Sequence, residues 1–373
     1  MIRIDRRLAE NFDWITFLIV ILITILGIMT IYSATRPAVE GEQPGFYLKQ
    51  ILWLILGIVA LFLIVKFDYI WLSRFSLLFY IGGILLLICV SFFGKKGMGA
   101  QRWLNLGIIS FQPSEFFRLI YIIMLSQCLS ITKSPFTTKS FLRIFLSIVF
   151  IPFILLLKQP DLGTALMIVG IFISLIFIKG LQKRLAILLV VIGLISVPFV
   201  GNILWEGLED YQKSRLVAFI KPGADPKGIG YHQNQSKITI GSGKFFGKGY
   251  LQGTQGPFRF LPEKHTDFIF AVFAEEWGFW GSLILLFLYF IVILRGIETA
   301  DMAKDEFGRV LAFGITFMFL IYFFVNVGMT LSMIPVVGLP LPFMSYGGTA
   351  LLSNFIAIGI LINIRMRRFE LFH

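Results

Sequence analysis

The sequence predicts an all-α protein that crosses a membrane about ten times. Hydrophobic residues make up 57% of the 373 residues and charged residues only 14%, whereas soluble domains carry about 25% charge. The apolar residues fall in runs long enough to span a bilayer as helices, which satisfy their own backbone polar groups in lipid. One stretch, Val310–Ile364, contains no charged residue at all.

Ten spans follow one another along the chain. The first, Trp14–Thr35, carries no charge and follows a basic N-terminal segment, so we expect a retained transmembrane helix rather than a cleaved signal peptide. Prolines and a glycine between residues 335 and 342 divide the charge-free stretch into the last two helices. The expected spans are 14–34, 49–66, 74–93, 114–131, 143–158, 162–179, 184–204, 267–294, 309–332 and 346–364.

The distribution of Lys and Arg predicts the orientation of the chain. One set of loops, together with both terminal segments, carries seventeen of these residues, and the short loops opposite carry six. The richer side is expected to be cytoplasmic, so both termini are cytoplasmic. The large polar loop at about 205–266, between helices seven and eight, is then external. We expect the whole chain, 1–373, to form a single transmembrane domain that includes this loop.

Charge and cysteine usage exclude several functions. The net charge of +12 is scattered between apolar runs, so topology and anionic lipid headgroups explain it better than nucleic acid does. Cys89 and Cys128 fall within apolar helices, which argues against a disulfide or a cysteine metal site. The three histidines have no metal-ligand spacing either, and we expect no protein-built metal site.

Two external segments carry charges in suggestive positions. In Gly97–Arg118, the glycines and Trp103 suggest a loop folded back onto the membrane surface. Glu115 and Arg118 then share one helix face near the interface. They form either a local ion pair or part of a site. Asp161 lies in the tight turn before helix six, where it either caps that helix or takes part in a site.

The third external segment, Gly228–Gly256, is rich in glycine. Such segments are usually disordered. Here aromatic and aliphatic residues interrupt the glycines. We therefore expect an ordered loop that covers a cavity or dips into the membrane interface.

Leu261–Phe270 is where the polar segment ends and the eighth helix begins. Four polar residues lie side by side there: Lys264, His265, Thr266 and Asp267. An acid and a base at this edge can act on a substrate that is half sugar and half lipid. The alternative is that Asp267 only stabilises the start of the helix. Glu275 and Glu276, deeper in the helix, are candidates to line a cavity, because carboxylates in a membrane are costly.

Six motifs occur in the order found in the RodA/FtsW (SEDS) family, which the chain resembles from about residue 97 to its end. They are GAQRWLNLG followed by FQPSE, KQPDLGTA, GIGYHQNQSKITIGSG, GKGYLQGTQ, LPEKHTDFIFAVFAEEWG and VGLPLPFMSYGGTALLSN. Each motif is weak alone, but six in register are specific. The GTQ and LPEKHTDFIF versions are more similar to the RodA (elongation) branch than to the FtsW (division) branch.

The resemblance implies a peptidoglycan glycosyltransferase that polymerises lipid II into glycan strands on the outer face of the bacterial cytoplasmic membrane during rod-shape elongation. It implies a class B penicillin-binding protein, a single-span transpeptidase, as partner, together with other membrane proteins of the elongation complex. The HTDFIF motif makes Asp267 the catalytic candidate. The substrate-binding candidates are Arg102 and Trp103 of QRW, Gln235 and Lys237 of QSK, and Glu115, Arg118, Lys264, His265 and Thr266. The family usually has Lys where this chain has Arg118, and the two are not interchangeable.

The implied reaction joins C1 of a donor MurNAc to the 4-hydroxyl of an acceptor GlcNAc, with undecaprenyl pyrophosphate as leaving group and inversion at C1. One direct displacement needs one general base, expected to be Asp267, and positive charge at the pyrophosphate. Arg102, Lys237 and Lys264 are the expected phosphate contacts, with Arg118 behind them. A divalent cation, Mg or Mn, could share that role.

Two other functional classes use a similar architecture. A lipid II flippase needs polar residues along a whole transmembrane path, and a non-catalytic scaffold needs only helices and loops. The candidate residues in this sequence gather on the expected external side. This placement favours catalysis over transport.

Overall fold

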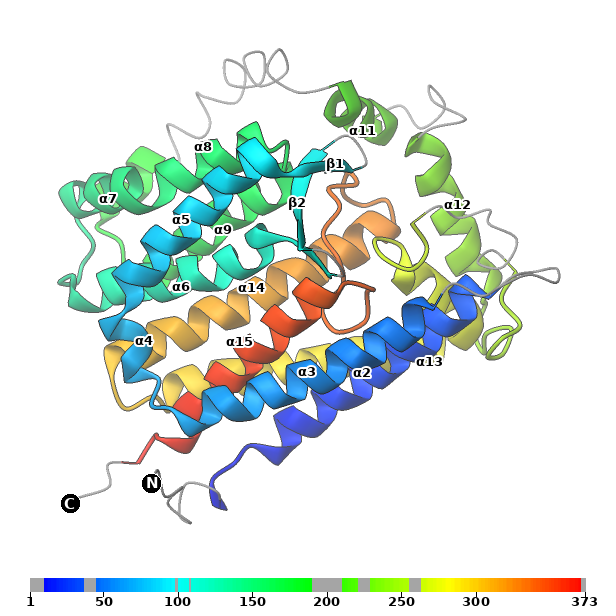
Figure 1. Cartoon of the computed structure of the whole chain (residues 1–373), viewed down its shortest axis with the longest axis horizontal. Coiled ribbons are helices and arrows are strands. Elements are labelled where there is room, and N and C mark those ends of the chain that lie inside the picture. Colours follow the sequence, from blue (N-terminus) through cyan, green and yellow to red (C-terminus); the bar gives the residue numbers. More distant parts are fainter. Residues whose placement is uncertain are drawn as a thin grey trace. The chain divides into compact units, whose positions relative to one another are not determined.

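The computed structural model describes residues 10–36, 45–97, 100–106, 109–189, 210–220, 229–254 and 263–369. The chain groups into two compact units (Figure 1). Unit 1 holds the chain up to Trp71 and again from Ala218, and unit 2 holds Leu72–Val217. That the chain acts as a single domain stays a prediction.

Nine helices in the described ranges are long and apolar enough to cross a membrane. They are α2 (Trp14–Thr35), α3 (Phe46–Lys66), α5 (Ser76–Phe93), α6 (Pro113–Ile131), the continuous run Thr138–Lys158, α9 (Leu162–Lys179), α13 (Ile269–Asp301), α14 (Glu306–Thr330) and α15 (Gly348–Met366). The predicted all-α polytopic membrane protein is confirmed. The seventh expected span, 184–204, is helical over residues 183–189, and its remainder lies outside the described residues.

The fifth span is longer than expected, because a π-helical turn joins two α-helices. α7 (Thr138–Ile144), η1 (Phe145–Val149) and α8 (Phe150–Lys158) form one run. Pro152 of α8 has no N–H to donate to the carbonyl of Ile148. The Tyr80 hydroxyl of α5 donates to that carbonyl instead, at 2.8 Å. A neighbouring helix thus satisfies the group that proline leaves open, as expected inside a membrane.

Unit 1 contains α2, α3, α13, α14 and α15, with α12 (Ile229–Ser242) packed against α13 and α14. α3 and α15 lie side by side (Figure 1). Small residues allow this approach. A Cβ atom on Gly57 would lie 2.8 Å from the ring of Phe355, and one on Gly359 would lie 3.2 Å from the Leu61 backbone. Glycines at helix contacts commonly serve this purpose in membranes.

α13 is broken at Gly278. This residue has φ 67° and ψ −162°, a conformation that essentially only glycine adopts. The chain segment 243–249 fits against the break. Phe279 N donates to Lys244 O at 2.9 Å, and Lys248 N donates to Glu275 O at 3.0 Å. The eighth helix expected at 267–294 therefore begins two residues later, is interrupted, and continues to Asp301.

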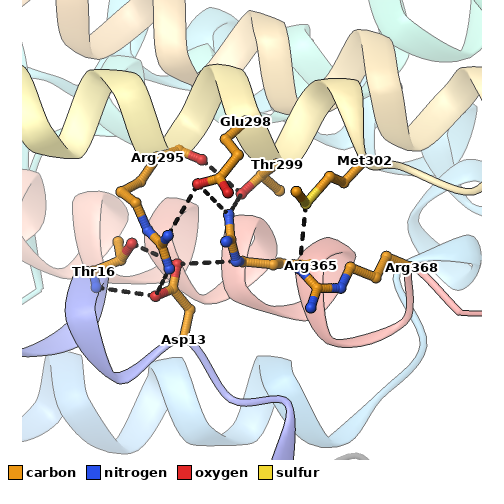
Figure 2. A network of polar contacts seen from close by, with 8 residues as sticks. All are labelled: Asp13, Thr16, Arg295, Glu298, Thr299, Met302, Arg365 and Arg368. Carbon is orange, nitrogen blue, oxygen red and sulfur yellow. Dashed lines mark hydrogen bonds and ion pairs between the residues drawn. The ribbon is translucent and has the colours of Figure 1, made fainter.

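An ion-pair network joins the start of α2 to α13 and α15 in unit 1 (Figure 2). Asp13 caps α2 by accepting from Thr16 N at 3.2 Å and from Thr16 Oγ1 at 2.6 Å. Arg295 of α13 donates to Asp13 at 2.6 Å, and Arg365 of α15 lies 3.5 Å from it. Both arginines also donate to Glu298, at 2.9 and 3.0 Å.

The network ties three helices together at one end. Burial opposes ionisation of Asp13, but hydrogen bonds from Arg295 and Thr16 outweigh it and lower the pKa of Asp13 below its ordinary value. The start of α2 and the end of α15 consequently lie at the same end of unit 1. That this end is cytoplasmic stays a prediction.

Unit 2 contains α5 to α9 and a small antiparallel sheet. The strands are β1 (Lys95–Gly97), β2 (Ala100–Leu106) and β3 (Ile109–Phe111), in the order β1-β2-β3. β2 and β3 pair with Leu104 opposite Phe111, and α6 follows at once. The expected folded-back loop is thus a strand meander. The chain passes from one unit to the other within two shorter helices, α4 (Ile70–Arg74) and α11 (Asp210–Ile220).

Candidate functional site

Asp267 lies in a turn over residues 263–268, directly before α13. The N-cap residue of α13 is Phe268, and its side chain makes no cap hydrogen bond. A simple N-cap role for Asp267 therefore does not describe the start of this helix. Asp267 is partly exposed, which suits a carboxylate that meets a substrate.

Three successive carbonyl groups of this turn are held by unit 1 residues far away in the sequence. Tyr346 N donates to His265 O at 2.8 Å. Ser345 Oγ donates to Thr266 O at 2.7 Å, and Asn326 Nδ2 donates to Asp267 O at 3.0 Å. Carbonyls that precede a helix have no partner inside it, so these three bonds fix the backbone that presents Asp267.

The neighbours of Asp267 take distinct places. His265 stacks on Phe46, with ring centroids 4.8 Å apart, and lies 5.7 Å from the ring of Tyr346. Burial lowers the pKa of His265 below its ordinary value, which favours the neutral ring. Thr266 Oγ1 donates to Glu263 at 3.0 Å. Lys264 is partly exposed.

Gln235 and Lys237 lie on α12. This helix forms the first half of the segment that was expected to be an ordered loop. Ser236 of this helix is fully buried and donates to Thr330 O at 2.8 Å. Lys237 is exposed and Gln235 is partly exposed. Ile240 packs against a cluster that contains Phe268, the residue after Asp267. The QSK motif is thus carried by a rigid element that packs beside the start of α13.

Glu275 and Glu276 brace the loop after α12. Glu275 accepts from Lys248 Nζ at 2.5 Å and from both the N and Oγ1 of Thr254 at 3.0 Å. Ser33 of α2 donates to Glu276. Both carboxylates are buried, with at most 1% exposed. That these two carboxylates also line a cavity stays a prediction.

The candidates in unit 2 form a charged cluster of their own. Arg118 pairs with Glu115, and both side chains are buried. Arg102 donates to Pro160 O and lies 3.7 Å from Asp161. Asp161 interacts electrostatically with both Glu115 and Arg118.

Asp161 also caps α9 by accepting from Thr164 N at 3.3 Å. The cap and the local ion pair both exist, and they belong to one cluster with Arg102. Trp103, beside Arg102 on β2, is exposed.

The predicted site residues therefore fall into two groups, one in each unit. Arg102, Trp103, Glu115 and Arg118 belong to unit 2; Gln235, Lys237, Lys264, His265, Thr266 and Asp267 belong to unit 1. In the described ranges, no group of three or more His, Cys, Asp or Glu residues is arranged to hold a metal ion.

Sequence reasoning missed the residues that hold the Asp267 turn. Asn326 is the clearest omission, because it is the one amide side chain on α14 and polar groups in a membrane helix need a reason. Ser345 and Tyr346 stand inside the MSYGG part of a motif already quoted. Their bonds to residues 265 and 266 have no sequence signature.

Comparison with known proteins gives near full-length matches. A family model described as "Cell cycle protein", covering FtsW, RodA and SpoVE, matches residues 13–370. The chain is 40% identical to peptidoglycan glycosyltransferase MrdB of Escherichia coli K12, over 96% of this chain and 94% of that protein. It is 33% identical to peptidoglycan glycosyltransferase RodA of Treponema pallidum, over 97% and 99%.

Among solved structures, one chain of a peptidoglycan synthase complex that coordinates polymerization and crosslinking is similar. Its TM-score is 0.81 at 28% identity, over 96% of this chain and 99% of that chain.

Proposed function

Because the chain belongs to the FtsW/RodA/SpoVE family of cell cycle proteins, we propose that it is a peptidoglycan glycosyltransferase of the bacterial cytoplasmic membrane. The observation that carries this proposal is the 40% identity, over nearly the full length of both chains, to a protein that bears this name. The nine membrane-spanning helices of the described ranges agree with a multi-pass enzyme.

The proposed substrate is lipid II, as both donor and acceptor, and the proposed general base is Asp267. The 4-hydroxyl oxygen of the acceptor GlcNAc attacks C1 of the donor MurNAc, and its proton passes to the Asp267 carboxylate. The bond from C1 to the pyrophosphate oxygen breaks, and undecaprenyl pyrophosphate leaves with that electron pair. The partly exposed carboxylate on a backbone fixed at three carbonyls supports this assignment.

The leaving pyrophosphate needs positive charge. Lys237 and Lys264 are the proposed contacts in unit 1. That Arg102 is a further phosphate contact stays a prediction of the sequence. Arg118 is buried and already paired with Glu115, so its proposed role is to balance the negative charge of Glu115 and Asp161 rather than to touch substrate. A divalent cation, Mg or Mn, would supply further positive charge at the pyrophosphate.

We also propose a penicillin-binding transpeptidase as partner, within an elongation complex. The support is the similarity to one chain of a complex that couples polymerization to crosslinking. A partner of this kind places each new strand beside the enzyme that crosslinks it.

The test is strand synthesis from lipid II by the purified protein, with and without a class B penicillin-binding protein. Wild-type protein is expected to make glycan strands. Asp267→Asn is expected to lose about 10²–10⁴ in rate, which is the usual cost of losing a general base, while it inserts and folds normally. The control is Asp305→Asn, the same change at the N-cap of α14, which should leave the rate unchanged because Asn caps about as well as Asp. A wild type that moves lipid II across vesicles without polymerising it would favour the flippase alternative instead.

A further inference from the structure

Asn326 is a fully buried amide near the C-terminal end of an apolar helix. It lies on α14 and has no exposed surface. Its Nδ2 group donates two hydrogen bonds to backbone carbonyls, to Asp267 O at 3.0 Å and to Leu339 O at 2.8 Å. Its Oδ1 atom is buried and has no hydrogen-bond partner within the described residues. A buried amide with one half unsatisfied is a cost, so the contribution of this side chain lies in its two donors.

The two bonds join segments that are distant in the sequence. Asp267 belongs to the turn before α13, and Leu339 belongs to the stretch between α14 and α15. The same stretch supplies Ser345 Oγ and Tyr346 N to the neighbouring carbonyls of residues 266 and 265. Asn326 therefore holds the one carbonyl that belongs to Asp267 itself, and anchors it to a helix rather than to a loop.

We infer that Asn326 is a positioning residue for the glycosyl transfer. It fixes the Cα position of Asp267, and with it the reach of the carboxylate toward the acceptor hydroxyl. This inference rests on the proposed role of Asp267 as general base. A general base must lie within hydrogen-bond distance of the proton that it removes, and small displacements of such a group are expensive in rate.

The chain offers a matched control in Asn363 of α15. This residue is also buried, with 1% exposed, and its Nδ2 donates to two backbone carbonyls, Ile64 O at 2.7 Å and Phe67 O at 2.5 Å. Its two donated bonds hold the end of α3, at the end of unit 1 away from Asp267, and its Oδ1 also accepts from Arg367. Asn326→Ala and Asn363→Ala thus remove the same kind of bracket from two places.

The first measurement is hydrogen–deuterium exchange on the full-length protein, which needs no activity. Asn326→Ala should speed amide exchange in a peptide that covers residues 263–272 severalfold, and Asn363→Ala should leave that peptide unchanged. Unchanged exchange in Asn326→Ala would overturn the inference, whatever the protein does to lipid II. If Asn326→Ala does not fold, Asn326→Ser, which keeps one donor, supplies the same comparison.

The second measurement separates kcat from KM in strand synthesis from lipid II. Asn326→Ala should lower kcat on the order of 10²-fold with little change in KM, and Asn363→Ala should retain kcat even if its melting temperature falls equally. Faster exchange with an unchanged kcat would mean that the bracket exists but does not position the base, which also overturns the inference. A wild type that makes no strands would instead refute the proposed function, and the exchange result would still decide whether Asn326 holds the turn.

Discussion

The role of Arg118 and Glu115 depends on the burial of their ion pair as well as on their charges. Their spacing in the sequence predicted a shared helix face, and the structure confirms an ion pair. What the spacing did not indicate is its burial, since α6 could equally have turned this face to solvent. Burial changes the role of the pair, because a charge inside the molecule must be balanced at short range.

Removing one partner of this pair should therefore be worse than neutralising both. Arg118→Gln leaves the Glu115 carboxylate buried near Asp161 and should cost roughly 3–5 kcal/mol. The double variant Glu115→Gln/Arg118→Gln should cost less than that single change. Thermal unfolding in detergent measures the difference. Arg309→Gln, in the half-exposed i,i+3 pair with Glu306, is the control and should cost less than about 1 kcal/mol.

Strictly additive losses in the double variant would show that the two charges do not depend on each other. Arg118→Lys is a finer probe of the same pair. It keeps the charge, so it should recover most of the stability that Arg118→Gln loses unless the shape of the guanidinium matters.

At the scale of elements, the spans that the sequence predicted best are those with long apolar runs and charged ends. α12 was less predictable. Its buried face carries Gln233, Ser236 and Thr239. These residues have the three-residue spacing of a helix face, but they are polar, whereas a buried helix face is usually apolar. Glycine also weakens any helix prediction there.

The break in α13 was not predictable at all. No residue pattern in the sequence marks it, because the break depends on the segment 243–249, some thirty residues earlier, which fits against Gly278.

Gly278→Ala should damage this element severely. A Cβ atom there would lie 2.2 Å from Gly247 N, and the residue would keep a backbone conformation that costs about 1–3 kcal/mol for anything but glycine. The melting temperature of the purified protein is the readout. Gly82→Ala in α5 is the control, because nothing lies within 4 Å of the added atom, and that variant should be as stable as wild type or slightly more stable. Equal melting temperatures for both variants would mean that the break in α13 is not required.

At the scale of the whole molecule, composition was sufficient for the fold class, because so apolar a chain has few other stable forms. The boundary between the polar segment and the next apolar run predicted that Asp267 lies at an edge of the membrane. It was insufficient for the partners of that residue. They come from α14 and from the stretch before α15, and only the folded chain brings these segments to residue 267.

Orientation in the membrane remains a prediction of the charge distribution, and single cysteines can test it. In a background without Cys89 and Cys128, Lys244→Cys should react with an impermeant thiol reagent added outside intact cells, and Lys139→Cys should not. Both positions are exposed, so a difference between them reports the side of the membrane rather than burial. The reverse labelling would place the Asp267 turn in the cytoplasm and contradict the proposed function.

The ion-pair partners of Asp13 are synthesised long after Asp13 itself. Arg295 follows Asp13 by 282 residues in the sequence. At about 5–20 residues per second, synthesis of this stretch takes on the order of tens of seconds. Arg365 appears later still, close to the end of the chain. Until both arginines have been synthesised, the Asp13 carboxylate at the start of α2 lacks at least one of its two guanidinium partners. The helix α2 thus gains both arginine partners only after most of α15 has been synthesised.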